Sequence, residues 1–397
     1  MPAVIHTWQA FKYHWMIWKF CGLQPPKNSA WRIPYTIYAL ILNLTVTILF
    51  PATLIINCCL SDNLNEFCEN LYITITDVVC NLKFLNVYIV RNQLLKIIPI
   101  LEKLDVRAKT KKEIKALQDG MESANYCFIT FFKMFCCAIV TSQLVVYLSK
   151  ERVLMYPAWF PFDWKSSKRN FLLAHCYQLY GLTVQAVQDL GNDTYPQAYL
   201  SILAAHIKAL SLRFRHLGIQ THNMTSRNAF ECKERNYREL VECIKDHKVL
   251  INLYLTIQGT ISNTCLVQFI CTGLAQCTIG VYMLYVGLNF SKILNIVIFL
   301  SAVTLEIFIL CYYGDRLCQE SENLTDAIYC CNWTEQNKDF KKAMQILLQR
   351  SQKIVVITAG NLIPVRLPTF VNVRFSNYLY VKIHSKIRLL SKNICTI

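Results

Sequence analysis

The sequence has few charged residues and lacks the motifs of common enzyme classes. Charged side chains make up 17% of its 397 residues, and 54% of the residues are hydrophobic. Ordinary soluble domains carry about 25% charged residues. The sequence contains no G-x-S-x-G, no H-E-x-x-H, no phosphate-binding P-loop and no Rossmann glycine pattern. These absences argue against an enzyme, and we expect no cofactor.

Metal-site spacing is also absent, although the chain has 19 cysteines. There are no paired C-x-x-C motifs and no Cys/His cluster, so we expect no metal. Most of the cysteines lie within apolar runs, where a thiol behaves as a small hydrophobic group. A disulfide remains open among Cys58, Cys59, Cys68 and Cys176.

Long apolar runs dominate the sequence and predict an all-α membrane protein. A helix needs about 20 apolar residues to cross a bilayer. We expect seven transmembrane helices, of which the fourth and fifth are too long for a single crossing. They are predicted at residues 34–60, 71–90, 126–148, 171–217, 250–286, 293–313 and 353–373.

The net charge of +16 is carried by loops between these runs, so we expect no nucleic-acid partner.

The first 33 residues are basic and aromatic, contain no acidic residue, and precede an apolar run that we expect to remain as a membrane anchor. A cytoplasmic amino terminus places most Lys and Arg residues on the cytoplasmic side, as the positive-inside rule requires. Seven crossings then place the carboxyl terminus outside the cell.

Two flanking segments carry further signals. Residues 1–33 are typical of a helix at the membrane surface, with a simple tail as the alternative. Residues 153–164 contain several aromatic residues and two prolines, which predicts an ordered cap at the membrane interface.

The last apolar run, 353–373, is polar along one side of the helix that it predicts. At 100° per residue, one stripe contains Thr358, Asn361, Val365, Thr369 and Asn372. Hydrocarbon cannot satisfy such a stripe, so it must face water or protein. Two interpretations stay open, a wall of an aqueous path and a packed face between helices.

Charged residues inside the predicted spans are scattered singly along the sequence: Asp77, Lys83, Lys133, Asp189, Asp193 and Glu306. Such residues face the interior of a bundle and find partners there. Asp77 and Lys83 are close enough in sequence for a strained pair. Glu306 is either a packing partner for a basic residue or part of a gating network. We see no internal repeat of the kind that secondary transporters carry.

Five short motifs occur in the order found in insect odorant receptors, and the chain resembles that family over nearly its whole length. They lie at residues 156–164, 191–196, 311–314, 326–333 and 358–360. Thr369-Phe370 is not followed by the Gln-Phe expected in the related gustatory receptors, which favours the odorant branch.

The resemblance implies a ligand-gated, non-selective cation channel in the dendritic membrane of olfactory neurons. The chain would form a heterotetramer with a shared co-receptor (Orco). The implied organisation is a surface helix at 1–33, six spans with a ligand-binding outer half and cytoplasmic extensions at 34–312, an anchor segment at 313–352, and the pore-side helix and tail at 353–397. The alternatives are a seven-span chemoreceptor without its own pore and a non-conducting assembly subunit.

The resemblance also implies a mostly apolar odorant pocket in the outer halves of the second, third, fourth and sixth spans. Such a site suits a small volatile ester, alcohol or ketone, held by shape more than by charge. For each side chain the alternative is ordinary packing between helices. The implied ligand-binding residues are Tyr72, Thr76, Thr141, Val145, Tyr177, Tyr180, Asn295 and Phe299.

The same resemblance implies a pore along the last helix, where this chain departs from the family. The implied pore residues are Thr369, Asn372, Tyr380, Ile383 and His384. Lys382 and Lys386 lie beside the constriction, and cationic groups there should oppose cation flow. The subunit therefore either adds an unusual edge to a pore made by co-receptor helices or does not conduct.

Overall fold

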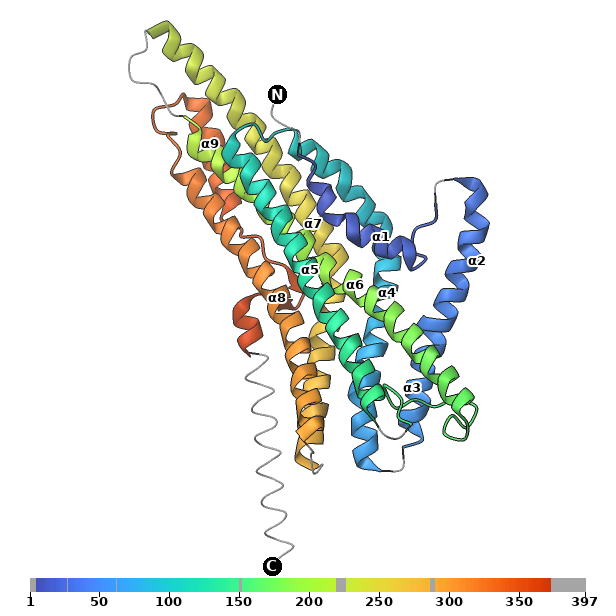
Figure 1. Ribbon diagram of the computed structural model, residues 1–397. Helices are drawn as coiled ribbons and strands as arrows, with labels where there is room; N and C mark the ends of the chain where they lie inside the picture. The colour runs from blue at the N-terminus through green and yellow to red at the C-terminus, as the bar shows by residue number, and fades with distance from the viewer. Residues whose placement is uncertain are drawn as a thin grey trace, which may run out of the picture.

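The computed structural model describes residues 5–26, 28–61, 63–149, 152–218, 226–285 and 290–372. Regular structure in these ranges is almost entirely helical (Figure 1). The α-helices are α1 (Lys12–Phe20), α2 (Arg32–Leu42), α3 (Phe50–Cys59), α4 (Leu64–Asp105), α5 (Lys111–Leu148), α6 (Lys168–His216), α7 (Ser226–Tyr285), α8 (Phe290–Tyr329) and α9 (Lys338–Ser351). Shorter elements are η1 (Thr7–Phe11), η2 (Ser29–Trp31), the π-helical η3 (Asn43–Leu49), β1 (Thr358–Ala359) and β2 (Ile363–Pro364).

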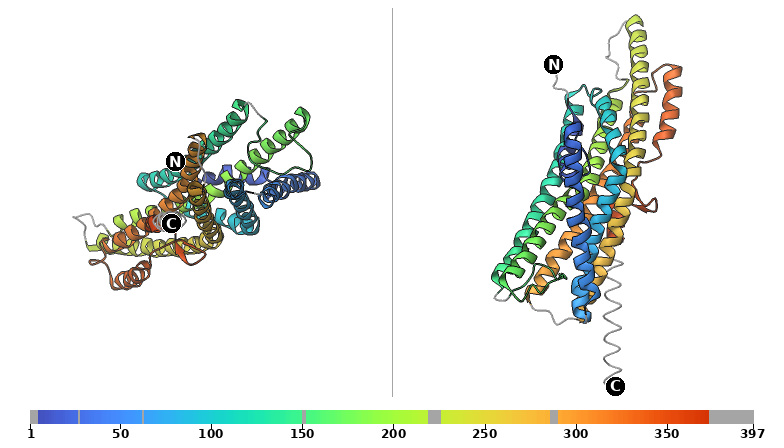
Figure 2. Two further views of the ribbon diagram at one scale, coloured as in Figure 1. Left: turned by 90° about the horizontal axis from the view of Figure 1, so that it is seen from below. Right: turned by 90° about the vertical axis from the view of Figure 1, so that its right-hand side faces the viewer.

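Helices α4 to α8 form one elongated bundle, with α6 packed against α5, α7 and α8 (Figures 1 and 2). At the upper end of Figure 1, α4 ends and α5 begins, and α9 packs nearby. At the lower end, α5 ends, α6 begins, and α3 gives way to α4. We use upper end and lower end in this sense below.

Four helical stretches of the described chain are long and apolar enough to cross a membrane: Ser29–Cys59, Glu66–Asp105, Lys111–Leu148 and Ile296–Tyr329. They overlap the first, second, third and sixth predicted spans. The fourth and fifth predicted spans lie within α6 and α7, which are continuous helices of 49 and 60 residues. Helix α6 is buried along most of its length and carries many polar residues. Its position inside the bundle explains why its composition is less apolar than that of the outer helices.

The prediction of one helix over 353–373 is wrong for the residues before 367. Strand β1 pairs with β2 in an antiparallel hairpin, and a helix begins only at residue 367. Gly360 and Asn361 have φ angles of 58° and 59°, in a region that glycine and asparagine tolerate but a helix excludes. Pro364 also lacks the N–H that a helix interior needs. Thr358, Asn361 and Val365 therefore do not share one helical face with Thr369 and Asn372.

Helix α7 holds this hairpin by side-chain hydrogen bonds. Gln258 donates to the carbonyl oxygen of Thr358 at 2.8 Å and accepts from its backbone N–H at 3.0 Å. Tyr254 donates to the carbonyl oxygen of Val356 at 2.8 Å, and Ser262 donates to that of Thr358 at 2.9 Å. The hairpin is thus fixed against α7 although its strands are short.

The amino-terminal segment packs against the bundle through its apolar face. Phe11 and Trp18 are fully buried, and the Phe11 ring stacks on Tyr199 of α6 with centroids 4.0 Å apart. His14 lies 2.9 Å from the hydroxyl of Thr194, between Nε2 and Oγ1. Burial lowers the pKa of His14 to about 4, which keeps the imidazole neutral at pH 7.

Ion pairs tie the helices together at the upper end. Arg107 follows α4 and contacts Asp246 of α7 at 2.9 Å, and Arg213 of α6 contacts the same carboxylate. Arg213 also contacts Glu113 of α5 at 3.3 Å. Residues of four successive helices of the bundle, or just beyond their ends, therefore meet in one charge network.

Candidate functional site

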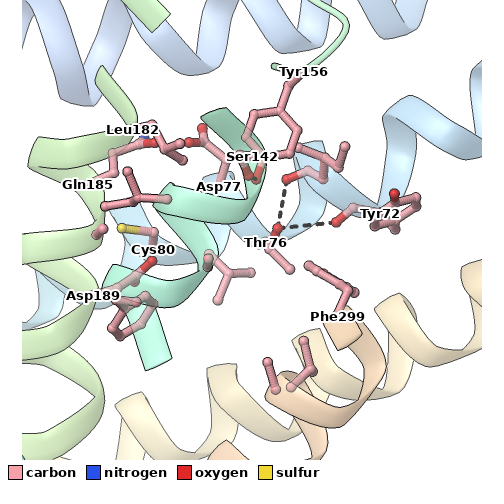
Figure 3. Close-up of a pocket in the computed structure, with 18 of the residues that line it drawn as sticks. Tyr72, Thr76, Asp77, Cys80, Ser142, Tyr156, Leu182, Gln185, Asp189 and Phe299 are labelled. Carbon is pink, nitrogen blue, oxygen red and sulfur yellow. Dashed lines mark hydrogen bonds between the residues drawn. The ribbon is translucent and has the colours of Figure 1, made fainter. Parts of the chain in front are cut away.

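A cavity of about 370 Å³ lies inside the lower half of the bundle (Figure 3). Helices α4, α5, α6, α7 and α8 all contribute to its wall, together with Phe50 and Leu54 of α3 and the loop at residues 155–157. A cavity of this size accommodates a small organic molecule.

One part of the cavity is lined by aromatic rings and hydroxyl groups. Tyr72 of α4 and Phe299 of α8 meet edge to face, with ring centroids 5.0 Å apart. Thr76, one helical turn from Tyr72, donates its hydroxyl proton to the carbonyl oxygens of Ile73 at 2.8 Å and Tyr72 at 3.3 Å (Figure 3). Because its proton is used in this way, the Thr76 oxygen is left as an acceptor for a ligand.

The loop between α5 and α6 supplies another wall. Tyr156 lines the cavity, and its hydroxyl lies 3.2 Å from that of Ser142 on α5. Gln178 of α6 donates to the carbonyl oxygen of Tyr156 at 2.8 Å, and the N–H of Trp159 donates to Thr53 of α3 at 3.0 Å. The predicted order of this aromatic segment is confirmed, because the loop is fixed to α3, α5 and α6.

The remaining part of the cavity, which we call the acidic floor, is made by Asp77, Lys83, Gln185, Asp189, Asp193, Gln268 and Glu306. Residues three or four apart share one face of a helix. Asp77, Cys80 and Lys83 therefore form a stripe on α4, and Gln185, Asp189 and Asp193 form a stripe on α6. The two stripes meet across the cavity.

Two contacts organise the acidic floor. Lys83 of α4 donates a hydrogen bond to Asp193 of α6, and both side chains are more than nine-tenths buried. Gln268 of α7 donates through Nε2 to Oε2 of Glu306 on α8, at 2.7 Å. Glu306 was expected to be either a packing partner for a basic residue or part of a gating network, and the hydrogen-bond partner that it finds is the neutral amide of Gln268. The predicted ion pair between Asp77 and Lys83 is not formed, because Lys83 is paired with Asp193.

The eight predicted ligand-binding residues divide into three groups. Tyr72, Thr76, Thr141 and Phe299 line the cavity. Tyr177 and Tyr180 point to η3 instead, where the Tyr177 hydroxyl donates to the carbonyl oxygen of Thr45 at 2.9 Å and the Tyr180 hydroxyl lies 3.4 Å from that of Thr45. The side chains of the other two predicted residues, Val145 and Asn295, lie outside what the structure describes.

Sequence reasoning missed the acidic floor. The charged residues are scattered along the sequence and were expected to find partners inside the bundle, but not to gather at one cavity. Five of the six line it, and Lys133 is the exception. The available signal was the spacing of Gln185, Asp189 and Asp193 by one turn each. Tyr156 was noted as part of an aromatic cap but not as a cavity wall.

Two of the five predicted pore residues fall within the described chain. Thr369 donates to the carbonyl oxygen of Pro364 at 2.7 Å, and Asn372 is exposed. Tyr380, Ile383 and His384 lie outside the described residues. Cys58, Cys59, Cys68 and Cys176 are free thiols in this structure, and within the described ranges no group of three His, Cys, Asp or Glu side chains could hold a metal ion.

A helical membrane bundle with an internal pocket for a small molecule is the architecture of a membrane receptor. Comparison with known proteins gives the family. The chain belongs to the odorant receptor family, because residues 63–376 match the sequence profile described as 7tm Odorant receptor. It is 42% identical to Odorant receptor 2a of Drosophila melanogaster over 380 residues, which cover 94% of this chain and 96% of that receptor.

Other relatives agree with this assignment. Odorant receptor 19a of Drosophila melanogaster is 30% identical over 388 residues, with 98% of each chain covered. The olfactory receptor OR5 of Machilis hrabei shares the fold, with a TM-score of 0.79 at 15% identity, covering 97% of this chain and 99% of the other. Its complex with eugenol gives a TM-score of 0.77.

Proposed function

We propose that this chain is an odorant receptor subunit whose internal cavity binds a small volatile molecule. Binding gates a non-selective cation channel that the chain forms as a heteromer with a co-receptor (Orco). The observation that carries the proposal is the cavity between α4, α5, α6 and α8, walled by Tyr72, Thr76, Tyr156 and Phe299. Family membership supports it, as does the eugenol complex of OR5 from Machilis hrabei.

The proposed orientation follows from charge. A cytoplasmic amino terminus places the basic upper end, with Arg107 and Arg213, in the cytoplasm. The cavity then lies in the outer half of the membrane, where a volatile ligand arrives. In this view 1–33 is a cytoplasmic surface segment, 34–312 carries the ligand pocket, 313–352 is a cytoplasmic anchor and 353–397 lines the pore. The receptor resides in the dendritic membrane of olfactory neurons.

Helices α7 and α8 offer a route from the cavity to the last helix. On α7, Gln268 belongs to the acidic floor and Gln258 holds the hairpin backbone. On α8, Glu306 belongs to the acidic floor and Asp315 accepts a hydrogen bond from Arg366 at 3.1 Å, just before the last helix begins. A ligand that prefers one arrangement of α7 and α8 therefore biases the position of the last helix.

The pore residues Thr369, Asn372, Tyr380, Ile383 and His384 remain part of this proposal. Lys382 and Lys386 beside them oppose cation flow, so we assign most of the conducting surface to co-receptor helices. The chain then acts mainly as the ligand-sensing subunit of the heteromer.

The test is whole-cell current from this chain co-expressed with the co-receptor over an odorant panel. Ala138→Trp and Thr76→Trp fill the cavity and should abolish the odorant response while leaving surface expression unchanged. Leu82→Trp serves as the matched control, because Leu82 is exposed on α4 outside the cavity. Absence of any odorant-evoked current from a surface-expressed wild-type chain would contradict the proposed function.

A further inference from the structure

The acidic floor contains more negative than positive groups. Four carboxylates line the cavity, from Asp77, Asp189, Asp193 and Glu306, and among the described lining residues Lys83 is the only lysine or arginine. Lys83 is already paired with Asp193. Carboxylates in a buried site need a counter-ion or hydrogen-bond donors to remain charged at low cost. Asp77 and Asp189 therefore face the cavity without a dedicated cation from the described part of the chain.

The hydrogen-bond inventory points in the same direction. Among the described residues that line the cavity, three buried acceptors have no partner: Oδ2 of Asp77, Oδ1 of Asp189 and Oε1 of Gln268. The only buried donor without a partner in this lining is Nε2 of Gln185. Asp77 and Gln268 are both more than nine-tenths buried. The described part of the floor thus has more unpartnered acceptors than donors, and its lysine is already paired.

These acceptors come from three different helices. Asp77 lies on α4, Asp189 on α6 and Gln268 on α7, and Figure 3 shows Asp77, Cys80, Gln185 and Asp189 on the facing sides of α4 and α6. The opposite part of the cavity carries Tyr72 and Phe299, which offer an apolar surface. The cavity therefore has an aromatic part and an acidic part in which unpartnered acceptors outnumber unpartnered donors among the described residues.

We propose that the acidic floor recognises the protonated amino group of a small amine, whose hydrocarbon part lies against the aromatic wall. A primary ammonium group supplies N–H donors and one positive charge, which are what the unpartnered acceptors and the carboxylates of the floor need. The inference rests on the proposed function and gives it a ligand class. It also replaces the expectation that the ligand is held by shape more than by charge.

Three ligands of the same shape test the proposal: 2-phenylethylamine, 2-phenylethanol and propylbenzene. Binding is measured by thermophoresis on the full chain in lipid nanodiscs at pH 7, where an alkyl amine is protonated. The expected dissociation constant of the amine is about tenfold or more below that of the alcohol, and the hydrocarbon binds more weakly still.

Charge-removing variants locate the binding. Asp77→Asn and Asp189→Asn keep the side-chain shape but remove the charge, so each should weaken amine binding by about tenfold and change alcohol binding by less than about twofold. Glu102→Gln is the matched control, because Glu102 is exposed on α4 outside the cavity, and it should alter neither affinity.

The wild-type comparison needs no variant, so a variant that fails to fold leaves the test decisive. The proposal is overturned if the amine binds no more tightly than the alcohol. That result would indicate that water molecules hydrogen-bond to the carboxylates of the acidic floor. The proposal is also overturned if both Asp→Asn variants still bind the amine more tightly than the alcohol by the wild-type ratio. In either case odorant-evoked current through the heteromer would leave the proposed function standing, so the two failures are distinguishable.

Discussion

Lys83 of α4 and Asp193 of α6 form an ion pair inside the bundle, where their side chains are 6% and 5% exposed. The two residues are 110 positions apart in the sequence. Their pairing therefore fixes the axial position of α4 relative to α6. Lys83 is also the only lysine or arginine among the described residues that line the cavity, so the pair uses the positive charge of that part of the wall.

Removing one member of this pair should destabilise the protein strongly. Lys83→Met leaves a buried carboxylate without its partner, a change that typically costs about 3–5 kcal/mol. The expected result is a large fall in the melting temperature of the detergent-solubilised chain, followed by intrinsic fluorescence.

The double variant Lys83→Met with Asp193→Leu provides the control. It removes both charges and should recover most of the lost stability, because an apolar pair avoids the desolvation penalty. If the double variant melts as low as Lys83→Met, the single variant acts through packing rather than through an uncompensated charge.

The hydrogen bonds from Gln258 to the hairpin predict a separation of binding from gating. Gln258→Leu removes bonds to both backbone groups of Thr358 but touches no cavity residue. We expect odorant affinity within about twofold of wild type and a maximal current reduced several-fold, because the hairpin is released from α7. Whole-cell dose–response curves combined with direct ligand binding measure the two effects.

Thr256→Val is the matched control for Gln258→Leu. Thr256 is half-buried on the same helix, and its hydroxyl donates to the carbonyl oxygen of Asn252 within α7. The current should remain unchanged in this variant. A parallel loss of affinity and current in Gln258→Leu would show that the hairpin supports folding of the pocket instead of gating.

Glycine substitutions offer a second test of the hairpin. Gly360 has a φ of 58°, and a Cβ atom there would lie 2.6 Å from Cδ2 of Leu266. Gly360→Ala should destabilise the chain by about 1–2 kcal/mol from the left-handed backbone alone. Gly259→Ala, in the interior of α7 with nothing within 4 Å of the added atom, should instead stabilise it by about 0.5–1 kcal/mol. Equal effects of the two variants on the melting temperature would argue against the left-handed turn.

The sequence predicts the helices of this fold well but the hairpin and the acidic floor poorly. Apolar runs show where long helices lie, because burial in a membrane or a bundle requires them. The run at 353–373 is apolar enough for either a helix or strands, and the prediction did not weigh the local turn signals of Gly360-Asn361 and Pro364. Contacts with Tyr254 and Gln258 of α7 then hold the hairpin in place. Those contacts join residues about a hundred positions apart, which no local pattern encodes.

The candidate site shows the same limit. Spacing along α4 and α6 places Asp77 with Lys83 and Asp189 with Asp193, but it does not say which stripes meet. The axial offset between two packed helices depends on side-chain packing along their whole length. Of the residues that the family resemblance implied, Thr76 and Phe299 line the cavity, whereas the hydroxyl of Tyr177 donates to Thr45 of η3 instead.

The buried His14 predicts acid sensitivity of the amino-terminal segment. Burial holds the pKa of His14 at about 4 in the folded protein, below its ordinary value of 6.5. Because the unfolded segment binds a proton more readily, the stability that neutral His14 contributes is present above pH 6.5 and is lost as the pH falls from 6.5 to 4. Trp15 and Trp18 lie beside His14 on α1, so their fluorescence should report detachment of the segment in this pH window. His14→Gln removes the titrating group and should flatten the fluorescence change between pH 6.5 and 4, whereas His216→Gln, at the exposed end of α6, should leave it intact. An unaltered transition in His14→Gln would assign the acid sensitivity to another group.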